Sequence, residues 1–236
     1  MNDIKLIDIH THLVPNVDDG VNSLTLAIEI IKSMIEDGVK EIILTPHKQS
    51  NRSKGTIKDI KESFKRIESE VFNLGLPIKV HLGYELRYYT HLRPDYHDLV
   101  ISDTKYLFIE FDSHFDPNIE QVISYITSLG LKLIIAHIER YKYLKYNDIV
   151  YFRNLGVLVQ VNAKTIYNPT GFRQKRLIRK LLKNKQIDFI ASDVHNDTTR
   201  TSDLKIAYDK LMNKVDKKYL NDIFYQNAFD IIHNSK

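Results

Sequence analysis

Residues 5–12 read KLIDIHTH, and this stretch decides which folds the rest of the chain can adopt. Its apolar run lacks a clean period of two, which is typical of a strand buried on both faces of a parallel sheet. The run ends in His10 and His12, and two residues at this spacing in a strand point to the same side. The chain therefore begins with a buried strand that brings two imidazoles to its carboxyl end.

Six more apolar runs follow, and longer amphipathic segments separate them. The expected strands are Lys5–Ile9, Glu41–Leu44, Ile78–Gly83, Tyr106–Phe111, Lys132–Ala136, Val157–Val161 and Asp188–Ala191. The expected helices are Ser23–Asp37, Lys58–Leu74, Asn118–Leu129, Asn147–Leu155, Arg173–Asn184, Ser202–Lys214 and Lys217–Ile232. This alternation predicts a parallel α/β fold, either a barrel or an open doubly wound sheet. No composition break or internal repeat divides the chain, so one domain over residues 1–236 is expected.

Composition narrows the classes of function. The chain has 236 residues, no cysteine and a net charge of +4. The lack of cysteine excludes disulfides, thiolate metal sites and cysteine-nucleophile chemistry. The charge is too small and too evenly spread to indicate a nucleic-acid partner. Because the first residues do not resemble a signal peptide and no apolar run approaches the roughly 18 residues of a membrane helix, we expect a cytoplasmic protein without membrane insertion.

The residues at the strand ends carry the functional prediction. Six of the seven strands end in histidine or acidic residues, which are His10, His12, His47, Glu85, Glu110, His137, Asp193 and His195, and the sixth strand ends in Asn162. In a barrel of parallel strands the carboxyl ends meet on one face, where barrel active sites form. A single histidine after a strand is usually a structural residue, but the repetition at six strands predicts a shared site.

These side chains offer only nitrogen and oxygen donors, which suits Mn, Fe or Zn. In the loop after the first strand, Asp18 is expected to return a carboxylate to the two histidines, and Asp8 to orient one of them as a hydrogen-bond acceptor. With Asp18 the candidates number nine, too many for one ion, so two or three divalent metal ions are predicted. Glu110 lies inside a hydrophobic strand and is the expected bridging ligand, because a buried carboxylate needs a partner.

The motifs also resemble a known family. DIHTHLVPNVDDG, TPHK, GYE, FIEF, AHIER and ASDVHNDTTR follow one another from Asp8 to Arg200, as in the PHP-type metal-dependent tyrosine phosphatases of bacterial capsule and exopolysaccharide loci. The HxH pair is shared by all PHP proteins, whereas the DDG loop, AHIER and the SDxHN ending are typical of the phosphatase branch. The resemblance implies a distorted TIM-like (β/α)7 barrel, the PHP fold, that uses Mn²⁺ or a related ion.

The resemblance assigns residues as well. It matches the metal ligands to His10, His12, Asp18, His47, Glu85, Glu110, His137, Asp193 and His195, and two phosphate-binding arginines to Arg140 and Arg200. It implies a protein-tyrosine phosphatase that acts on the phosphotyrosine tail of a cognate tyrosine autokinase and so regulates capsular and exopolysaccharide synthesis. Relatives are monomers or larger rings, which leaves a homo-oligomer open. One departure is Lys48, where many relatives have a second histidine or an aromatic residue.

The expected reaction is attack on phosphorus by a metal-activated water, in line with the departing phenol oxygen. Arg140 and Arg200 suit phosphate because a guanidinium makes two parallel hydrogen bonds with it. His195 or a water is expected to supply any proton that the leaving group needs. These three residues are the predicted catalytic set beside the metal ligands.

Three other functions compete with this interpretation. A PHP phosphoesterase for a small phosphate monoester, such as histidinol phosphate, shares the metals and the chemistry. A metal-binding module without catalysis is disfavoured because no ligand position is missing. A nucleotide-binding protein lacks the Gly-rich phosphate loop after its first strand. The remaining histidines, His81, His91, His97, His114 and His233, lie outside the pattern and are interpreted as surface or packing residues.

Overall fold

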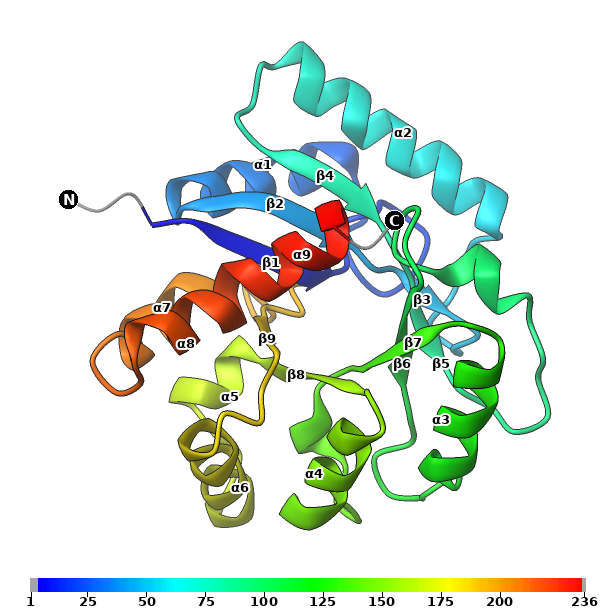
Figure 1. The fold of residues 1–236 in the computed structure, drawn as a ribbon. Helices are drawn as coiled ribbons and strands as arrows, with labels where there is room; N and C mark the ends of the chain where they lie inside the picture. The colour runs from blue at the N-terminus through cyan, green and yellow to red at the C-terminus, as the bar shows by residue number, and fades with distance from the viewer. Residues whose placement is uncertain (1–3, 235–236) are drawn as a thin grey trace.

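The computed structural model describes residues 4–234 as a ring of parallel strands with helices around its outside (Figure 1). The strands are β1 (Leu6–Thr11), β2 (Val39–Leu44), β3 (His47–Lys48), β4 (Lys79–Leu82), β5 (Glu85–Arg87), β6 (Tyr106–Glu110), β7 (Lys132–Ile135), β8 (Leu158–Asn162) and β9 (Phe189–Ala191). The helices are α1 (Leu24–Glu36), α2 (Ile57–Asn73), α3 (Ile119–Ser128), α4 (Tyr146–Asn154), α5 (Ala163–Tyr167), α6 (Phe172–Lys183), α7 (Leu204–Leu211), α8 (Lys217–Asn221) and α9 (Asn227–Asn234).

The nine strands occupy seven positions around the ring, because two positions are each split in two. Pro46 separates β2 from β3, and Gly83 with Tyr84 separates β4 from β5. One sheet has the order β1-β2-β4 and the other β3-β5-β6-β7-β8-β9, and all pairs in both are parallel. The seven expected βα positions are therefore present, and the breaks in two of them are what the sequence analysis missed.

The ring closes at the carboxyl ends of its strands. Beyond β1 and β9, the backbone N–H of His12 donates to the Val194 carbonyl at 2.8 Å, and that of Asp193 donates to the His10 carbonyl at 2.9 Å. In the described part of the chain no ladder joins β4 to β6. Instead, the segment before β6 pairs antiparallel with it through an isolated bridge between Val100 and Leu107. The fold is thus the predicted distorted (β/α)7 barrel, and an open doubly wound sheet is excluded.

Helix α9 covers the amino-terminal end of the ring, where it lies beside β1 (Figure 1). Its residues Ala228, Ile231 and Ile232 are buried against Ile7 and Phe108 from the strands. Burying such side chains stabilises the fold by roughly 1.5–3 kcal/mol each. With one end of the barrel filled in this way, the opposite end is left for polar side chains.

The helix predictions were correct to within a few residues for the six outer helices. Ser23 caps α1 and Thr56 caps α2 by accepting backbone N–H groups, as these residue types do at helix starts. The predicted terminal helix is present from Lys217 to Asn234 without interruption, and its middle turn, Asp222–Gln226 between α8 and α9, is π-helical. The sequence analysis did not predict α5, a five-residue helix after β8. Within residues 4–234, no helix combines the length and the apolarity that crossing a membrane requires.

Candidate metal and phosphate site

The nine residues expected as metal ligands gather at the carboxyl ends of the strands. Each is 6% exposed or less, and they are His10, His12, Asp18, His47, Glu85, Glu110, His137, Asp193 and His195. Because these side chains are almost fully buried, their charges must be balanced within the cluster. The structure brings the predicted residues together, and their assignment as ligands stays a prediction.

Glu85, the first residue of β5, lies at the centre of the cluster. Its Oε2 atom is 3.3 Å from Nε2 of His12, 3.4 Å from Nε2 of His10 and 2.7 Å from Nδ1 of His47. Its Oε1 atom is 2.8 Å from Nε2 of His137. The break between β4 and β5 places this carboxylate here. The carboxylate positioned to be shared is therefore Glu85, whereas Glu110 was the one predicted from the sequence.

The first group of donor atoms belongs to His10, His12, Glu85 and Asp193. The Nε2 atoms of His10 and His12 are 3.1 Å apart, and Oδ1 of Asp193 lies 3.5 Å from each. The Nδ1 atom of His12 is 2.7 Å from Oδ2 of Asp18, so its proton donates to this carboxylate. The Nε2 atom of His12 is thereby left with its lone pair directed into the group, as in a histidine that ligates a metal.

The second group contains His12, Asp19, His47 and His195, so the carboxylate that the DDG loop brings to this group is Asp19, where Asp18 was predicted. The Oδ1 atom of Asp19 is 3.3 Å from Nε2 of His47 and 3.5 Å from Nε2 of His195. Both oxygens of Asp18 are occupied, by His12 and by the backbone N–H groups of His47 and Gly20. Asp19 therefore offers the free carboxylate, while Asp18 orients His12.

His195 presents one nitrogen to this second group. Its Nδ1 atom donates to the backbone carbonyl of Asp193 at 2.9 Å, and its buried Nε2 atom has no hydrogen-bond partner. Burial lowers the pKa of His195 to about 4. A neutral imidazole with a free Nε2 lone pair suits a ligand better than the general acid that the sequence analysis considered.

The third group is formed by His47, Glu85 and Glu110, with His137 beside it. Two arginines that the sequence analysis missed neutralise Glu110: Nη2 of Arg52 lies 3.0 Å from it and Nη1 of Arg87 lies 3.4 Å from it. Arg52 comes from the polar loop 49–56 and Arg87 from β5. Nothing in the composition of this loop indicated which of its side chains enters the site.

Lys48, the residue after His47, contacts the same loop. Its Nζ atom donates to the Gly55 carbonyl at 3.1 Å, and the Ser53 hydroxyl donates to the His47 carbonyl at 2.7 Å. These bonds tie the loop to β3. They keep Arg52 over the metal cluster.

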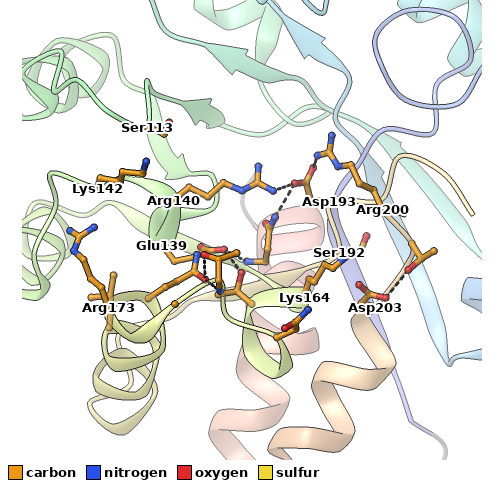
Figure 2. A pocket seen from close by; sticks show the side chains of 18 of the residues that line it. Ser113, Glu139, Arg140, Lys142, Lys164, Arg173, Ser192, Asp193, Arg200 and Asp203 are labelled. Carbon is orange, nitrogen blue, oxygen red and sulfur yellow. Dashed lines mark hydrogen bonds and ion pairs between the residues drawn. The ribbon is translucent and has the colours of Figure 1, made fainter. Parts of the chain in front are cut away.

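Asp193 joins the metal cluster to both predicted arginines. Its Oδ2 atom accepts from Nη2 of Arg140 at 2.6 Å and from Nδ2 of Asn162 at 2.8 Å. Its Oδ1 atom accepts from Nη2 of Arg200 at 2.8 Å. The side chains of Arg140 and Arg200 are 38% and 33% exposed, so each keeps donors that face the adjoining cleft. Figure 2 shows the two guanidinium groups on either side of this carboxylate.

Two site residues have a backbone conformation that non-glycine residues rarely adopt. The φ angle of His137 is 31° and that of Asp193 is 58°, both in the left-handed region. Such conformations cost about 1–3 kcal/mol each and persist where the surroundings impose them, often at functional sites. Here they end β7 and β9 sharply and turn both side chains inward.

Asp8 and Gln160 support the cluster from below. Asp8 accepts from the backbone N–H groups of His10 and Ser192, and so fastens β1 to the end of β9 instead of orienting a histidine ring as expected. Gln160, which the sequence analysis overlooked, accepts from the His137 N–H at 2.6 Å and donates to Asn162 at 2.9 Å. Asn162 in turn holds Asp193, so the supporting bonds run from β7 through β8 to β9.

The donor set fits divalent cations. Several buried polar atoms in it lie close to one another but have no partner in hydrogen-bonding geometry, among them Oε2 of Glu85, both ring nitrogens of His47 and Nε2 of His195. An unpartnered buried polar atom costs about 1–3 kcal/mol, which a bound cation would offset. Carboxylate oxygens and imidazole nitrogens without thiolates are the ligands of Mn, Fe and Zn sites.

Comparisons with known proteins agree with this geometry. A family model described as capsular polysaccharide synthesis, CpsB/CapC, matches residues 6–233. The tyrosine-protein phosphatase CpsB of Streptococcus agalactiae is 29% identical over an alignment 244 positions long, which covers 97% of this chain and 99% of that protein. The tyrosine-protein phosphatase YwqE of Bacillus subtilis is 29% identical over an alignment 201 positions long, which covers 83% of this chain and 79% of that protein.

A solved structure is similar over nearly the whole chain. It comes from a crystallographic study of YwqE from Bacillus subtilis and CpsB from Streptococcus pneumoniae, described as metal-dependent tyrosine phosphatases. The TM-score is 0.88 at 26% identity, and the match covers 98% of this chain and 96% of the other.

Proposed function

The chain belongs to the CpsB/CapC family of capsular polysaccharide synthesis, and from this premise we propose that it is a metal-dependent protein-tyrosine phosphatase. One observation carries the proposal: Asp193 contacts the histidine cluster on one side and both Arg140 and Arg200 on the other. A single buried carboxylate thus couples a cation site to two phosphate-binding groups. A metal-storage or structural site has no need of such exposed guanidinium donors.

The proposed metal ligands are the predicted ones, with Asp19 in place of Asp18. They would hold two or three divalent ions, with Mn²⁺ as the expected ion and Fe or Zn as alternatives. Bound ions would supply the Lewis acidity that activates water and neutralises charge on the phosphoryl oxygens. The basis for more than one ion is that the three donor groups are distinct. Any two of them have one residue in common, which is His12, Glu85 or His47.

The chain's own residues bind and orient the phosphate. Arg140 and Arg200 are held in place by Asp193, so little further side-chain freedom is lost when their remaining donors grip a phosphoryl group. Asn162 donates to the same Asp193 carboxylate and so helps to fix its orientation. Tyrosine is a favourable leaving group, since a phenol ionises near pH 10, and this reduces the need for a protein acid.

The proposed substrate is phosphotyrosine in the tail of a cognate tyrosine kinase, in the control of capsular and exopolysaccharide synthesis. The names of the relatives support this assignment. A single catalytic PHP domain over the whole chain, a cytoplasmic location and an open possibility of homo-oligomers belong to the same proposal. The second candidate, a phosphatase for a small monoester such as histidinol phosphate, would use the same metal chemistry.

The proposal is tested with purified protein and an aryl phosphate. Hydrolysis is expected with Mn²⁺ and is expected to stop after a chelator is added, then to return with fresh Mn²⁺. Full turnover after exhaustive metal removal would rule out the proposal. A second panel compares phosphotyrosine peptides with histidinol phosphate at equal concentration, and a higher kcat/KM for histidinol phosphate would favour the second candidate.

A further inference from the structure

The cleft beside the metal cluster extends well past the two phosphate-binding arginines. It has a volume of about 700 Å³ and reaches from Asp193 and Arg200 to the start of α6. Figure 2 shows Lys142 and Arg173 at the side of this cleft away from Arg200, and Arg140 lies between that side and Arg200. The cleft therefore has room for more of a substrate than one phosphoryl group.

Five Lys and Arg side chains line the cleft; Lys164 donates to the Thr199 carbonyl at 3.0 Å, and the other four fall into two classes. Arg140 and Arg200 are paired with Asp193 at 2.6 Å and 2.8 Å. Lys142 and Arg173 have only neutral hydrogen-bond partners: Nζ of Lys142 is 2.8 Å from the His114 ring, and Nη2 of Arg173 donates to a backbone carbonyl at 2.8 Å. Over residues 4–234, no carboxylate lies within ion-pair distance of Lys142 or Arg173.

The acidic residues that line the cleft do not compensate these two cations. Glu139 is 5% exposed and accepts from the Asn162 N–H and the Thr165 hydroxyl, and burial raises the pKa of its carboxyl group. Asp203 is also 5% exposed and accepts from the Thr201 hydroxyl. The side of the cleft near Lys142 and Arg173 is therefore left with unbalanced positive charge, which favours an anion there.

We propose that Lys142 and Arg173 form a second anion subsite for an acidic group on the same substrate chain. This inference rests on the proposed function and adds a substrate preference to it. The group is the carboxylate of an acidic residue or the phosphate of a second modified residue, because a guanidinium fork and an ammonium bind both. Peptides with a negative charge close to the scissile phosphotyrosine are then the preferred substrates.

The test compares kcat/KM on four substrates. These are an aryl phosphate, a phosphotyrosine peptide flanked by alanines, the same peptide flanked by glutamates, and the peptide with a second phosphotyrosine. For the double variant Lys142→Ala/Arg173→Ala we expect a loss of about tenfold on the two more acidic peptides, chiefly in KM, because two charge-assisted contacts are removed at a half-open site. The neutral peptide and the aryl phosphate should be hydrolysed as before.

The matched control is Lys175→Ala/Arg176→Ala. It removes the same charge from exposed positions on α6 that do not line the cleft, and it should change no substrate by more than about twofold. An equal loss in the control, or a loss of the same factor on all four substrates, would overturn the subsite. A wild-type protein that hydrolyses aryl phosphate but shows no preference for acidic peptides would overturn it too. A wild-type protein inactive on all four substrates would instead overturn the proposed function.

The two acidic peptides separate the sources of the anion. A larger loss on the glutamate peptide than on the doubly phosphorylated one assigns the subsite to carboxylates, and the reverse assigns it to phosphate. Either result supports the inference. Thermal unfolding of both double variants verifies that they remain folded.

Discussion

Asp18 and Asp19 are neighbours in the sequence but have different surroundings. Asp18 is buried and accepts from the His12 ring and two backbone N–H groups, while Asp19 is about one-third exposed and faces His47 and His195. Consecutive residues in a loop point in different directions, so identity alone cannot tell which one ligates. The sequence predicted that this loop contributes a carboxylate, and the loop backbone decided which one.

Substitutions at these two positions should therefore differ in kind. Asp19→Asn removes a proposed ligand, and we expect one metal ion fewer per chain at saturating Mn²⁺. Asp18→Asn removes the group that orients His12, so the number of ions should be retained with an affinity about 10–100-fold weaker. Elemental analysis after dialysis at several Mn²⁺ concentrations measures both. If Asp18→Asn lost an ion at saturation and Asp19→Asn did not, the assignment would be reversed.

Arg140 is the residue at which binding of phosphate should be separable from binding of metal. Because Asp193 keeps Arg200 and Asn162 as partners, Arg140→Ala should retain its metal ions. Its kcat/KM on an aryl phosphate should fall about 10²–10³-fold, the usual effect of removing a group that stabilises developing charge. Steady-state kinetics and metal content on the same sample decide this. Arg66→Ala, at an exposed position on α2, is the control and should be neutral; kinetics of Arg140→Ala equal to those of this control would remove Arg140 from the site.

At the scale of elements, strand ends were predictable and strand interruptions were not. The apolar runs located all seven positions, because burial on both faces leaves a plain composition signal. The breaks at Pro46 and at Gly83-Tyr84 depend on hydrogen bonds with neighbouring strands, which no local pattern reports. Glu85 reaches the centre of the site because of such a break. This is why the sequence indicated Glu85 as a candidate but gave the central role to Glu110.

The DDG loop depends on Gly20, because a side chain at this position has no room. A Cβ atom on Gly20 would lie 2.1 Å from the His12 carbonyl oxygen, so Gly20→Ala must push the loop outward and move Asp18 and Asp19 with it. We expect a loss of about 1–3 kcal/mol in the free energy of unfolding, typical of overpacking, together with weaker metal binding. Gly171→Ala is the matched control, since nothing lies within 4 Å of a Cβ atom there. Denaturant unfolding compares the two variants. Equal free energies of unfolding would show that the loop moves outward without a cost in stability.

Helix α9 is fastened to the barrel by an ionic contact at the end opposite the site. Both oxygens of Glu41 on β2 lie within 3.1 Å of Nε2 of His233 on α9, and Oε2 is 2.8 Å from His81 on β4. The sequence analysis interpreted both histidines as surface or packing residues, since nothing in one dimension connects positions 81 and 233. Burial by itself would raise the pKa of Glu41, but the hydrogen bonds from His81 and His233 lower it below the ordinary value.

This direction fixes the pH dependence of the contact. A carboxyl group whose pKa is lowered on folding stabilises the fold above its unfolded pKa, near 4.3, and the contribution is lost as the pH falls through the folded value. The free energy of unfolding of the wild type should therefore exceed that of Glu41→Gln by about 1 kcal/mol at pH 6, and the difference should shrink as the pH falls below about 4.3 and through the lowered pKa of Glu41. Urea unfolding from pH 6 downward measures it, with Glu68→Gln on α2 as the exposed control. A difference that stays constant as the pH falls would mean that the charge of Glu41 does not matter.

At the scale of the whole molecule, the two ends of the barrel are closed by different means. The amino-terminal end is filled by apolar residues of α9, and the carboxyl end holds the buried cluster of ionisable groups. The sequence indicated the buried ionisable cluster strongly, because histidine or acidic residues recur at the ends of six of the seven expected strands. It gave no sign of Arg52 or Arg87, whose positions depend on how a loop and a short strand pass over the site.

Metal ions should therefore contribute to the stability of the whole barrel as well as to catalysis. The proposed ligands come from β1, β3, β5, β6, β7 and β9 and from the loops beside them, so bound ions would connect most of the ring across its carboxyl end. An ion that binds only the folded state at 100 times its Kd adds about 2.7 kcal/mol, which in a chain of this size corresponds to roughly 5–10 °C in Tm. We expect this rise when Mn²⁺ replaces a chelator.

Glu85→Gln, which alters the shared carboxylate, should lose the rise, whereas His97→Ala, at an exposed histidine far from any strand end, should keep it. Thermal unfolding of the three proteins, with Mn²⁺ and with chelator, measures this. A wild-type Tm that does not change with Mn²⁺ would mean that the ions do not stabilise the barrel. A Glu85→Gln protein whose Tm still rises with Mn²⁺ would place the centre of the metal site away from β5.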